Sequence, residues 1–156
     1  NKARRYVYIC TPYLIIDNEM MTALCLAAKN GVDVRIMTPG TPDKKLVFLL
    51  TQSYYRQLLE NGVKIYEYQP GFLHAKTFVC DDEIAVVGTI NLDYRSLYLH
   101  FEDGVWIYGN DVIWSMKEDF VQTLEDCHTV PLEFCKNRKI PVRIMQNVLR
   151  AFAPML

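Results

Sequence analysis

The stretch from residue 71 to residue 102, GFLHAKTFVCDDEIAVVGTINLDYRSLYLHFE, places a histidine and a lysine two residues apart, at His74 and Lys76. Side chains alternate between the two faces of a β-strand, so both would share one face of a strand expected over residues 74–80. An imidazole buried beside an ammonium group with no anion is costly. We therefore expect the pair at a strand end that faces a cleft or a partner, where a phosphate would relieve the repulsion.

A histidine and a lysine at this spacing are weak evidence alone, because such pairs are usually solvated residues at a sheet edge. Here they open a longer ordered string, HxKxxxxDxxxxxxGTxN. This string resembles the signature of the phospholipase D superfamily, usually written HxKxxxxDxxxxxxGSxN, with a threonine that keeps the hydroxyl group of the serine. Its six specified positions are His74, Lys76, Asp81, Gly88, Thr89 and Asn91.

The resemblance covers nearly the whole chain, from Tyr6 to the tail. Three segments are similar to the C-terminal catalytic half of bacterial cardiolipin synthases: YICTPYLIIDNEMMTALCLAAKNGVDVRIMTPG, SYYRQLLENGVKIYEYQPGFLHAK and NLDYRSLYLHFE. In that family two such halves pack around a pseudo-two-fold axis, and each gives one motif to a shared, metal-independent site. This sequence holds one motif. The resemblance therefore implies a partner, which is either the missing N-terminal half or a second copy of this chain.

The resemblance also implies a reaction. One motif histidine attacks phosphorus to give a phosphohistidine, the other protonates the leaving alcohol, and no cofactor takes part. The expected substrate is an anionic phospholipid, phosphatidylglycerol, two molecules of which give cardiolipin and glycerol. We expect the full-length protein at the bacterial cell membrane, with a membrane surface among its partners, and we expect this piece to be soluble and inactive without the other half.

The resemblance gives each motif residue an expected role. The attacking histidine usually belongs to the N-terminal half, so His74 is expected to be the general acid and then the base that activates the acceptor alcohol. A free imidazole pKa of about 6.5 suits either task. Lys76, Thr89 and Asn91 are expected to bind phosphate by donating to the phosphoryl oxygens. Outside the motif, Thr89 would be interpreted as an ordinary strand end and Asn91 as a turn residue.

Two carboxylates complete the candidate catalytic set. Asp81 belongs to the signature, but seven strand residues at about 3.3 Å each put it roughly 23 Å from His74, so we interpret it as a structural residue of a turn or strand end. Glu102 is our candidate for the carboxylate that fixes the tautomer of His74 and supports its charged form. The alternative interpretation of Glu102 is an exposed glutamate near a strand start.

Strands and helices that alternate along the chain must position these residues. This order predicts an α/β fold, a mixed β-sheet sandwiched by helices in the manner of a phospholipase D-like half. Asp93, Arg95 and Ser96 are expected to cap and brace the turn after the motif. The predicted strands are 5–11, 32–38, 63–68, 74–80, 84–88 and 104–108, and the predicted helices are 17–29, 44–60, 110–126 and two short ones after residues 131 and 141.

Length and charge limit the function. A chain of 156 residues, 51% of them hydrophobic, predicts a single domain over residues 1–156 with a sizeable core. A net charge of −1 provides no basic field, so nucleic acid is not an expected partner and a nuclease-like homodimer is disfavoured. Five cysteines without a CxxC spacing predict reduced, mostly buried thiols. No apolar run approaches the roughly 20 residues of a membrane-spanning helix.

Two alternatives remain open at this stage. The chain could be a single-motif phosphodiesterase that homodimerises, or a non-catalytic module that binds only phosphate or a partner. The tail, residues 140–156, is amphipathic and basic, with Arg143 and Arg150 among its apolar residues. Such a stripe more often covers the core or a partner helix, and docking on a membrane surface is the alternative.

Overall fold

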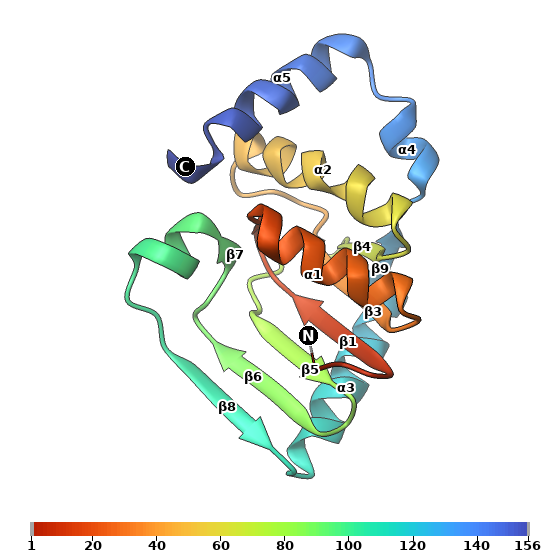
Figure 1. Cartoon of the computed structure of the whole chain (residues 1–156), viewed down its shortest axis with the longest axis vertical. Helices are drawn as coiled ribbons and strands as arrows, with labels where there is room; N and C mark the ends of the chain where they lie inside the picture. Colours follow the sequence, from red (N-terminus) through yellow and green to blue (C-terminus); the bar gives the residue numbers. More distant parts are fainter. Residues whose placement is uncertain (1, 156) are drawn as a thin grey trace.

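The computed structural model, which describes residues 2–155, is built around a seven-stranded mixed sheet. Three parallel strands, β1, β3 and β4, adjoin one another, and the strands outside them pair antiparallel with their neighbours. Figure 1 shows this order from one edge of the sheet toward the other. Across the sheet the strands are β8 (Gly104–Tyr108), β6 (Ile84–Gly88), β5 (Thr77–Cys80), β1 (Tyr6–Cys10), β3 (Asp33–Pro39), β4 (Lys64–Tyr68) and β9 (Cys127–Thr129).

Helices cover both faces of this sheet (Figure 1). α1 (Asn18–Lys29) and α2 (Lys45–Glu60) lie on one face, and α3 (Val112–Thr123) lies on the other. Alternation along β1 explains the two layers, because Ile9 packs in the core under α1 and α2, whereas Tyr8 and Cys10 pack toward α3. The prediction of a mixed sheet sandwiched by helices is therefore confirmed.

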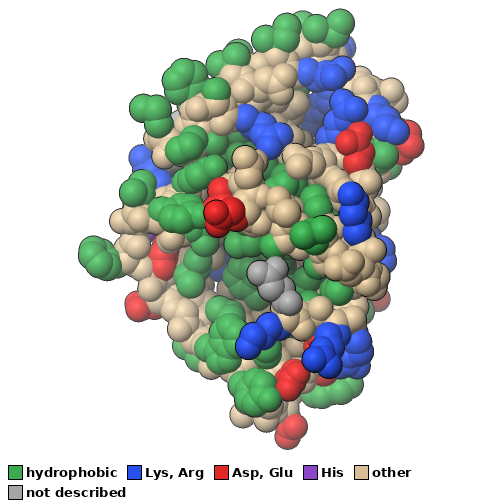
Figure 2. All heavy atoms as spheres, in the orientation of Figure 1, with side chains coloured by type: hydrophobic (Ala, Val, Ile, Leu, Met, Phe, Trp, Pro, Cys, Tyr) green, Lys and Arg blue, Asp and Glu red, His purple; other side chains and the backbone are tan. Residues whose placement is uncertain are grey.

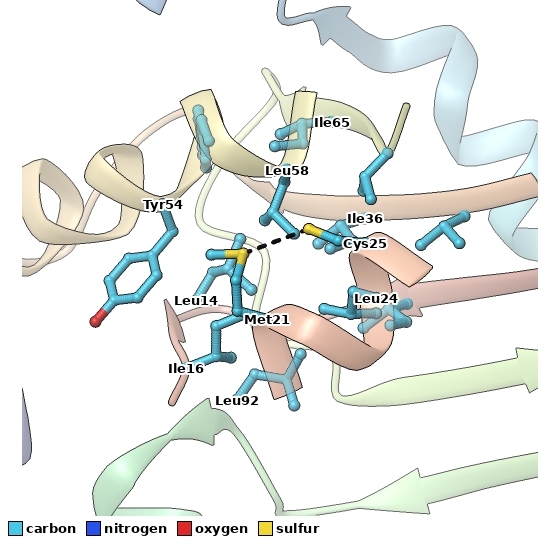
Figure 3. Packing of buried hydrophobic residues seen from close by; sticks show 14 of the residues in the cluster. Leu14, Ile16, Met21, Leu24, Cys25, Ile36, Tyr54, Leu58, Ile65 and Leu92 are labelled. Carbon is cyan, nitrogen blue, oxygen red and sulfur yellow. Dashed lines mark hydrogen bonds between the residues drawn. The ribbon is translucent and has the colours of Figure 1, made fainter. Parts of the chain in front are cut away.

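The larger core lies between the sheet and the pair α1 and α2. Figure 3 shows Met21 and Leu24 of α1 and Leu58 of α2 gathered in this core with Ile36 of β3. The Met21 and Cys25 sulfur atoms lie 3.8 Å apart. α1 starts where predicted, because the Asp17 side chain accepts the Met20 N–H at 2.7 Å as an N-cap.

The C-terminal helices form an additional layer. α4 (Leu132–Lys136) and α5 (Ile140–Ala151) pack on α2, at the top of Figure 1. Pro141 lies in the first turn of α5, where its missing N–H leaves no helical hydrogen bond unmade. Several short elements were not predicted: β2 (Leu14–Ile15), which pairs with β7 (Leu92–Asp93), β9, a π-helical turn at Arg95–Leu99 and 3₁₀ turns at Leu124–Asp126 and Ala153–Met155.

The predicted strand over residues 74–80 begins later than expected. β5 starts at Thr77, so His74 and Lys76 lie in the irregular segment that precedes the strand. The reason is strand pairing: β1 ends at Cys10, which is opposite Thr77, and earlier residues have no β1 partner to bond. The expectation that alternation along a strand sets the directions of His74 and Lys76 was therefore wrong.

The turn between β5 and β6 anchors the first strand. Asp81 and Asp82 both adopt left-handed backbone angles, with φ of 56° and 61°. The Asp81 carboxylate accepts three backbone N–H groups, from Arg4 at 2.7 Å, Arg5 at 2.9 Å and Tyr6 at 2.8 Å. Burial opposes ionisation, but these N–H groups prevail and lower the pKa of Asp81 below its usual 3.8.

We predict that Asp81→Ala lowers the free energy of unfolding by about 2 kcal/mol, because three N–H groups lose an ionised acceptor. Urea unfolding at neutral pH measures this loss. Folding lowers the pKa of Asp81, so its contribution is present above pH 3.8 and the difference between the two proteins should shrink as the pH falls through the folded-state pKa. Asp119→Ala, at an exposed position on α3, is the matched control. Equal stability of both variants at neutral pH would contradict the assignment.

The burial of the cysteines agrees with the sequence expectation. Cys10, Cys25 and Cys135 are buried, as predicted for most of the thiols. Burial raises the pKa of the Cys10 thiol to about 12, so it stays protonated near neutral pH. Among the helices in the described part of the chain, none has both the length and the apolar content needed to cross a bilayer.

Candidate functional site

The candidate site is built where the end of β6 meets the start of β8. Gly88 and Gly104 are paired across these strands. A Cβ atom added to Gly88 would lie 2.1 Å from the Asp103 carbonyl oxygen and 2.8 Å from the Gly104 Cα. Only glycine permits this approach of the two backbones. The glycine of the GTxN string is therefore explained by contact between strands.

This close approach joins Thr89 to the segment that carries Glu102. The Thr89 N–H donates to the Asp103 carbonyl at 2.8 Å, and the Asp103 N–H donates to the Thr89 hydroxyl oxygen at 3.0 Å. The Thr89 hydroxyl in turn donates to a Glu102 carboxylate oxygen. A motif residue and the candidate carboxylate, thirteen positions apart, thus form one hydrogen-bonded unit.

Asn91 extends this unit into the π-helical turn. Its Nδ2 donates to the Ser96 hydroxyl at 3.1 Å, while its Oδ1 is buried without a hydrogen-bond partner among the described residues. The Ser96 N–H donates to Asp93 Oδ1 at 2.8 Å, so Asp93 and Ser96 brace the turn as predicted. An unpaired buried acceptor is costly, which marks Asn91 as a group whose hydrogen bonding is incomplete in this structure.

Lys76 lies within electrostatic range of Glu102 and Asp93. Its ammonium group donates to the backbone carbonyl of His74 at 2.7 Å and interacts electrostatically with Glu102 and Asp93. The His74 ring is exposed, and its neighbour is Phe72, with ring centroids 5.4 Å apart. Lys76 is therefore part of the polar cluster, whereas the His74 imidazole lies at the rim.

Hydrogen bonding favours the ionised form of Glu102. Hydrogen bonds from Thr89 and Ser96, with the positive groups nearby, lower the pKa of Glu102 below its usual 4.5. Burial lowers the pKa of Lys76 below 10.5, and the Glu102 and Asp93 charges act in the opposite direction. A pocket of about 180 Å³ opens beside this cluster, with Asn91 and Ser96 in its wall.

The structure brings together four of the six predicted site residues, and these are Lys76, Thr89, Asn91 and Glu102. The Glu102 carboxylate makes no hydrogen bond to the His74 ring within residues 2–155. The nearer imidazole is that of His100, whose Nδ1 lies 3.8 Å from Glu102 Oε1. Asp81 is engaged with the backbone of β1, in line with the interpretation of it as a structural residue.

Sequence reasoning did not select His100, and it treated Ser96 only as a brace. Ser96 accepts from Asn91 and also contributes to the low pKa of Glu102, so it links two predicted site residues. The available signal for His100 was its position two residues before Glu102. The sequence pattern does not mark such an exposed histidine as a site residue, because the π-helical turn before it determines which side chains lie beside it.

Solved structures define the class of fold. Phosphatidylserine synthase from Haemophilus influenzae is similar with a TM-score of 0.75, over 99% of this chain and 40% of that one, at 18% identity. Nuc from Salmonella typhimurium, described as a phospholipase D family member, is similar with a TM-score of 0.72, over 83% of this chain and 84% of that one, also at 18% identity. At such identities the likeness concerns the fold, which is that of phospholipase D-like proteins.

Sequence comparison then specifies the family. The family model described as "Cardiolipin synthase, PLD-like domain" matches residues 1–124, and the chain belongs to this family. A cardiolipin synthase of Clostridium perfringens is 46% identical over all of this chain and 33% of its own length, and one of Geobacillus is 42% identical over 99% of this chain and 31% of its own. An uncharacterized protein of Streptococcus mutans is 52% identical over the whole chain. The chain spans about a third of the length of these curated relatives.

We predict that Gly88→Ala separates β6 from the start of β8, because the added Cβ meets backbone atoms that cannot rotate away. The cost should be about 1–3 kcal/mol of unfolding free energy, measured in urea. Gly71→Ala is the control, since a Cβ there has no atom within 4 Å. Amide chemical shifts of Thr89 and Asp103 should move in the Gly88 variant and stay in place in the Gly71 variant. Unchanged shifts in both would contradict the explanation of Gly88.

Proposed function

We propose that residues 1–156 form one domain with one motif, and that this domain is a catalytic half of a phosphatidyltransferase of the cardiolipin synthase type. The full-length enzyme would act at the bacterial cell membrane on phosphatidylglycerol, and would transfer a phosphatidyl group to a second phosphatidylglycerol with release of glycerol. The observation that carries the proposal is the assembly of Lys76, Thr89, Asn91 and Glu102 in one polar cluster. Family membership supports the same assignment.

The proposed phosphate site uses the cation of the cluster, Lys76, together with its hydrogen-bond donors. The Lys76 ammonium would bind a non-bridging phosphoryl oxygen and balance its charge. A half-turn of the Asn91 amide would keep the contact with Ser96 and turn the Nδ2 donors to the unpartnered side. The single proton of the Ser96 hydroxyl would then be donated to Asn91 Oδ1 in place of Glu102. This rotation would remove the unpaired acceptor and supply a donor to phosphate. The Thr89 hydroxyl is the third proposed donor, and its single proton would turn from Glu102 to a phosphoryl oxygen when phosphate binds.

The proposed role of His74 is proton transfer at the rim of the site. In the first step, a histidine nitrogen of the other half would form a bond to phosphorus as the bond from phosphorus to the glycerol oxygen breaks. The His74 imidazolium would give its proton to that oxygen. In the second step, neutral His74 would take the proton of the acceptor hydroxyl, whose oxygen then attacks phosphorus and releases the first histidine. The exposure of the ring supports this role, because the leaving group and the acceptor must both reach it.

Glu102 is proposed to hold His74 once the other half is in place. Its Oε2 is occupied by the Thr89 hydroxyl, while its Oε1 lies 3.8 Å from the His100 Nδ1, beyond hydrogen-bonding distance. When the Thr89 proton turns to phosphate, both oxygens of the Glu102 carboxylate would be free to accept an imidazole N–H. Its low pKa supports a role as a fixed negative charge beside a histidine that becomes positive.

An exposed apolar surface beside the cluster supports the need for a second half. Large apolar side chains on β8 and in the segment before it are more than half exposed, and Phe101 is fully exposed. Groups of exposed apolar side chains of this kind commonly mark protein interfaces. The curated relatives are also about three times as long as this chain. The members of the surface are Tyr98, Leu99, Phe101, Val105 and Trp106.

The role of His74 predicts a dependence on the leaving group. In the enzyme assembled with its second half, His74→Ala should abolish transfer from phosphatidylglycerol, where the leaving alkoxide needs a proton, with a loss of roughly 100- to 10,000-fold. A phosphodiester with a p-nitrophenol leaving group needs no proton, so the variant should still form the phosphohistidine with it. Rapid-quench detection of the acid-labile phosphoenzyme measures its formation from each of the two substrates.

The same experiment separates the two possible roles. If His74 were the nucleophile, the variant would form no phosphoenzyme with either substrate, and the assignment as general acid would be wrong. If transfer from phosphatidylglycerol continued at the wild-type rate, the proposed function itself would fail. His128→Ala, which changes an exposed histidine on β9, is the control and should behave as wild type.

Replacement of Thr89 tests the hydroxyl group itself. Thr89→Ser keeps the hydroxyl and restores the usual form of the signature, so we expect nearly full activity. Thr89→Val has a similar shape and no hydroxyl, and should reduce kcat by roughly 100- to 1,000-fold through the loss of one donor to the phosphoryl oxygens. Steady-state transfer assays of the assembled enzyme measure both variants. Equal activity of the valine and serine variants would exclude the hydroxyl from the reaction.

A further inference from the structure

The charges of the chain are segregated along its length. Residues 134–156 hold five of the 17 Lys and Arg residues and none of the 18 Asp and Glu residues. This leaves residues 1–133 with the remaining 12 cationic residues against all 18 acidic ones. A chain with a net charge of −1 therefore carries a positive C-terminal face. The five cationic residues of this segment are Lys136, Arg138, Lys139, Arg143 and Arg150.

A groove lined with arginines lies within this face, between α2, α4 and α5. Its volume is about 350 Å³. One carboxylate, Glu60, is among the described residues that line it, and Glu60 pairs with Arg56 at 2.9 Å. The lining therefore has an excess of positive charge. The arginines of the groove are Arg56, Arg138, Arg143 and Arg150.

Two of these arginines are held in place by aromatic rings. The Arg138 guanidinium lies 4.4 Å from the centre of the Phe134 ring, and that of Arg150 lies 4.5 Å from the centre of the Tyr54 ring. Arg138 also donates to the side-chain amide oxygen of Gln52, a buried residue at the wall of the groove. A guanidinium group fixed in this way loses little side-chain entropy when it binds an anion.

The outer face of α5 is apolar and exposed. Ile140, Ile144, Val148 and Phe152 recur every fourth residue, so they form one stripe along the helix, and their exposed fractions range from 48% to 70%. The groove residues of α5 recur at 143, 146, 147 and 150, about 130° around the helix from this stripe. The expectation that the tail stripe would cover the core holds for the inner face only. Figure 2 shows hydrophobic side chains over α5, with Lys and Arg side chains beside them at the upper right.

We propose that this C-terminal face docks on the surface of an anionic phospholipid bilayer. The stripe of α5 would enter the boundary between head groups and acyl chains, and the arginines of the groove, on the flank of the helix, would bind lipid phosphates at the level of the head groups. The stripe and the groove share no residue with the cluster around Glu102. This surface would add to the proposed function a means of holding the domain against its substrate-bearing membrane.

Charge complementarity favours a bilayer as the occupant. A helix with an apolar face, a basic flank and no acidic residue matches the requirements of an interfacial helix, which gains from both acyl burial and anionic lipid. Arginine side chains can follow the lipid phosphates while their stems remain among apolar groups. A protein helix packed on the stripe would satisfy the apolar residues alone, and would leave the groove without an anion.

Vesicle sedimentation tests the proposal. The 156-residue protein should bind vesicles of phosphatidylcholine mixed with phosphatidylglycerol, and should bind vesicles of phosphatidylcholine much more weakly. Arg143→Gln should lower the partition coefficient on the mixed vesicles about fivefold, since each cationic residue near such a surface contributes about that factor. Ile144→Gln combined with Val148→Gln should lower it about tenfold or more, because two apolar side chains no longer enter the interface.

Matched controls make these results specific. Arg4→Gln removes one exposed arginine near the β5–β6 turn, and Leu26→Gln combined with Val121→Gln changes exposed apolar residues of α1 and α3. These variants should bind as the wild type does. Circular dichroism spectra and unfolding midpoints confirm that each variant is folded.

Three outcomes would overturn the proposal. The first is the absence of binding to the mixed vesicles. The second is a loss of binding in Lys76→Ala while Arg143→Gln binds normally, which would assign the lipid contact to the catalytic cluster. The third is a protein that associates with itself and does not bind vesicles, and that becomes a monomer when Ile144 and Val148 are both changed to Gln. The stripe would then be a protein interface. None of these measurements involves phosphatidyl transfer. If the docking proposal fails, the catalytic proposal therefore remains intact.

Discussion

The candidate site depends on one close contact between backbones, that of Gly88 with Asp103 and Gly104. Because no side chain separates the two strands there, Thr89 and Glu102 meet directly and the Asp103 backbone closes a small ring of hydrogen bonds around the threonine. Lys76 and Asn91 are then arranged around a carboxylate whose position is already fixed. In the proposed function this fixed frame would leave only rotations of the Asn91 amide and the Thr89 hydroxyl before these groups act on a phosphoryl group.

The signature residues therefore fall into two groups, those that hold the fold together and those proposed to bind phosphate. Asp81 holds the beginning of β1 through three backbone N–H groups, and Gly88 allows two strands to approach. Lys76, Thr89 and Asn91 are the residues that we propose as the cation and donors of the phosphate site. One short string of sequence thus specifies both a site and the sheet edge on which the site is built, which explains why its positions span two strands and their connecting turn.

Local patterns predicted the layers well, because each strand and helix of the core reveals its inner face through periodicity and its ends through residues such as Asp17. Register and long-range pairing could not be predicted in the same way. The start of β5 is decided by where β1 ends, at Cys10, and this shifted His74 and Lys76 out of the strand. The contact between Thr89 and Glu102 was likewise hidden, since it depends on how β6 and β8 align. Glu102 was nevertheless selected, through family resemblance.

The position of β8 at the end of the strand order has a consequence for handling the domain alone. An outermost strand offers its main-chain amides and carbonyls along one side as a template on which another extended chain can add. The exposed apolar side chains of β8 add a hydrophobic attraction to this unpaired edge. They are Val105, Trp106 and Tyr108. Preparations of the domain alone should therefore be kept dilute, and a soluble peptide able to extend the sheet past β8 would act as a protective cap.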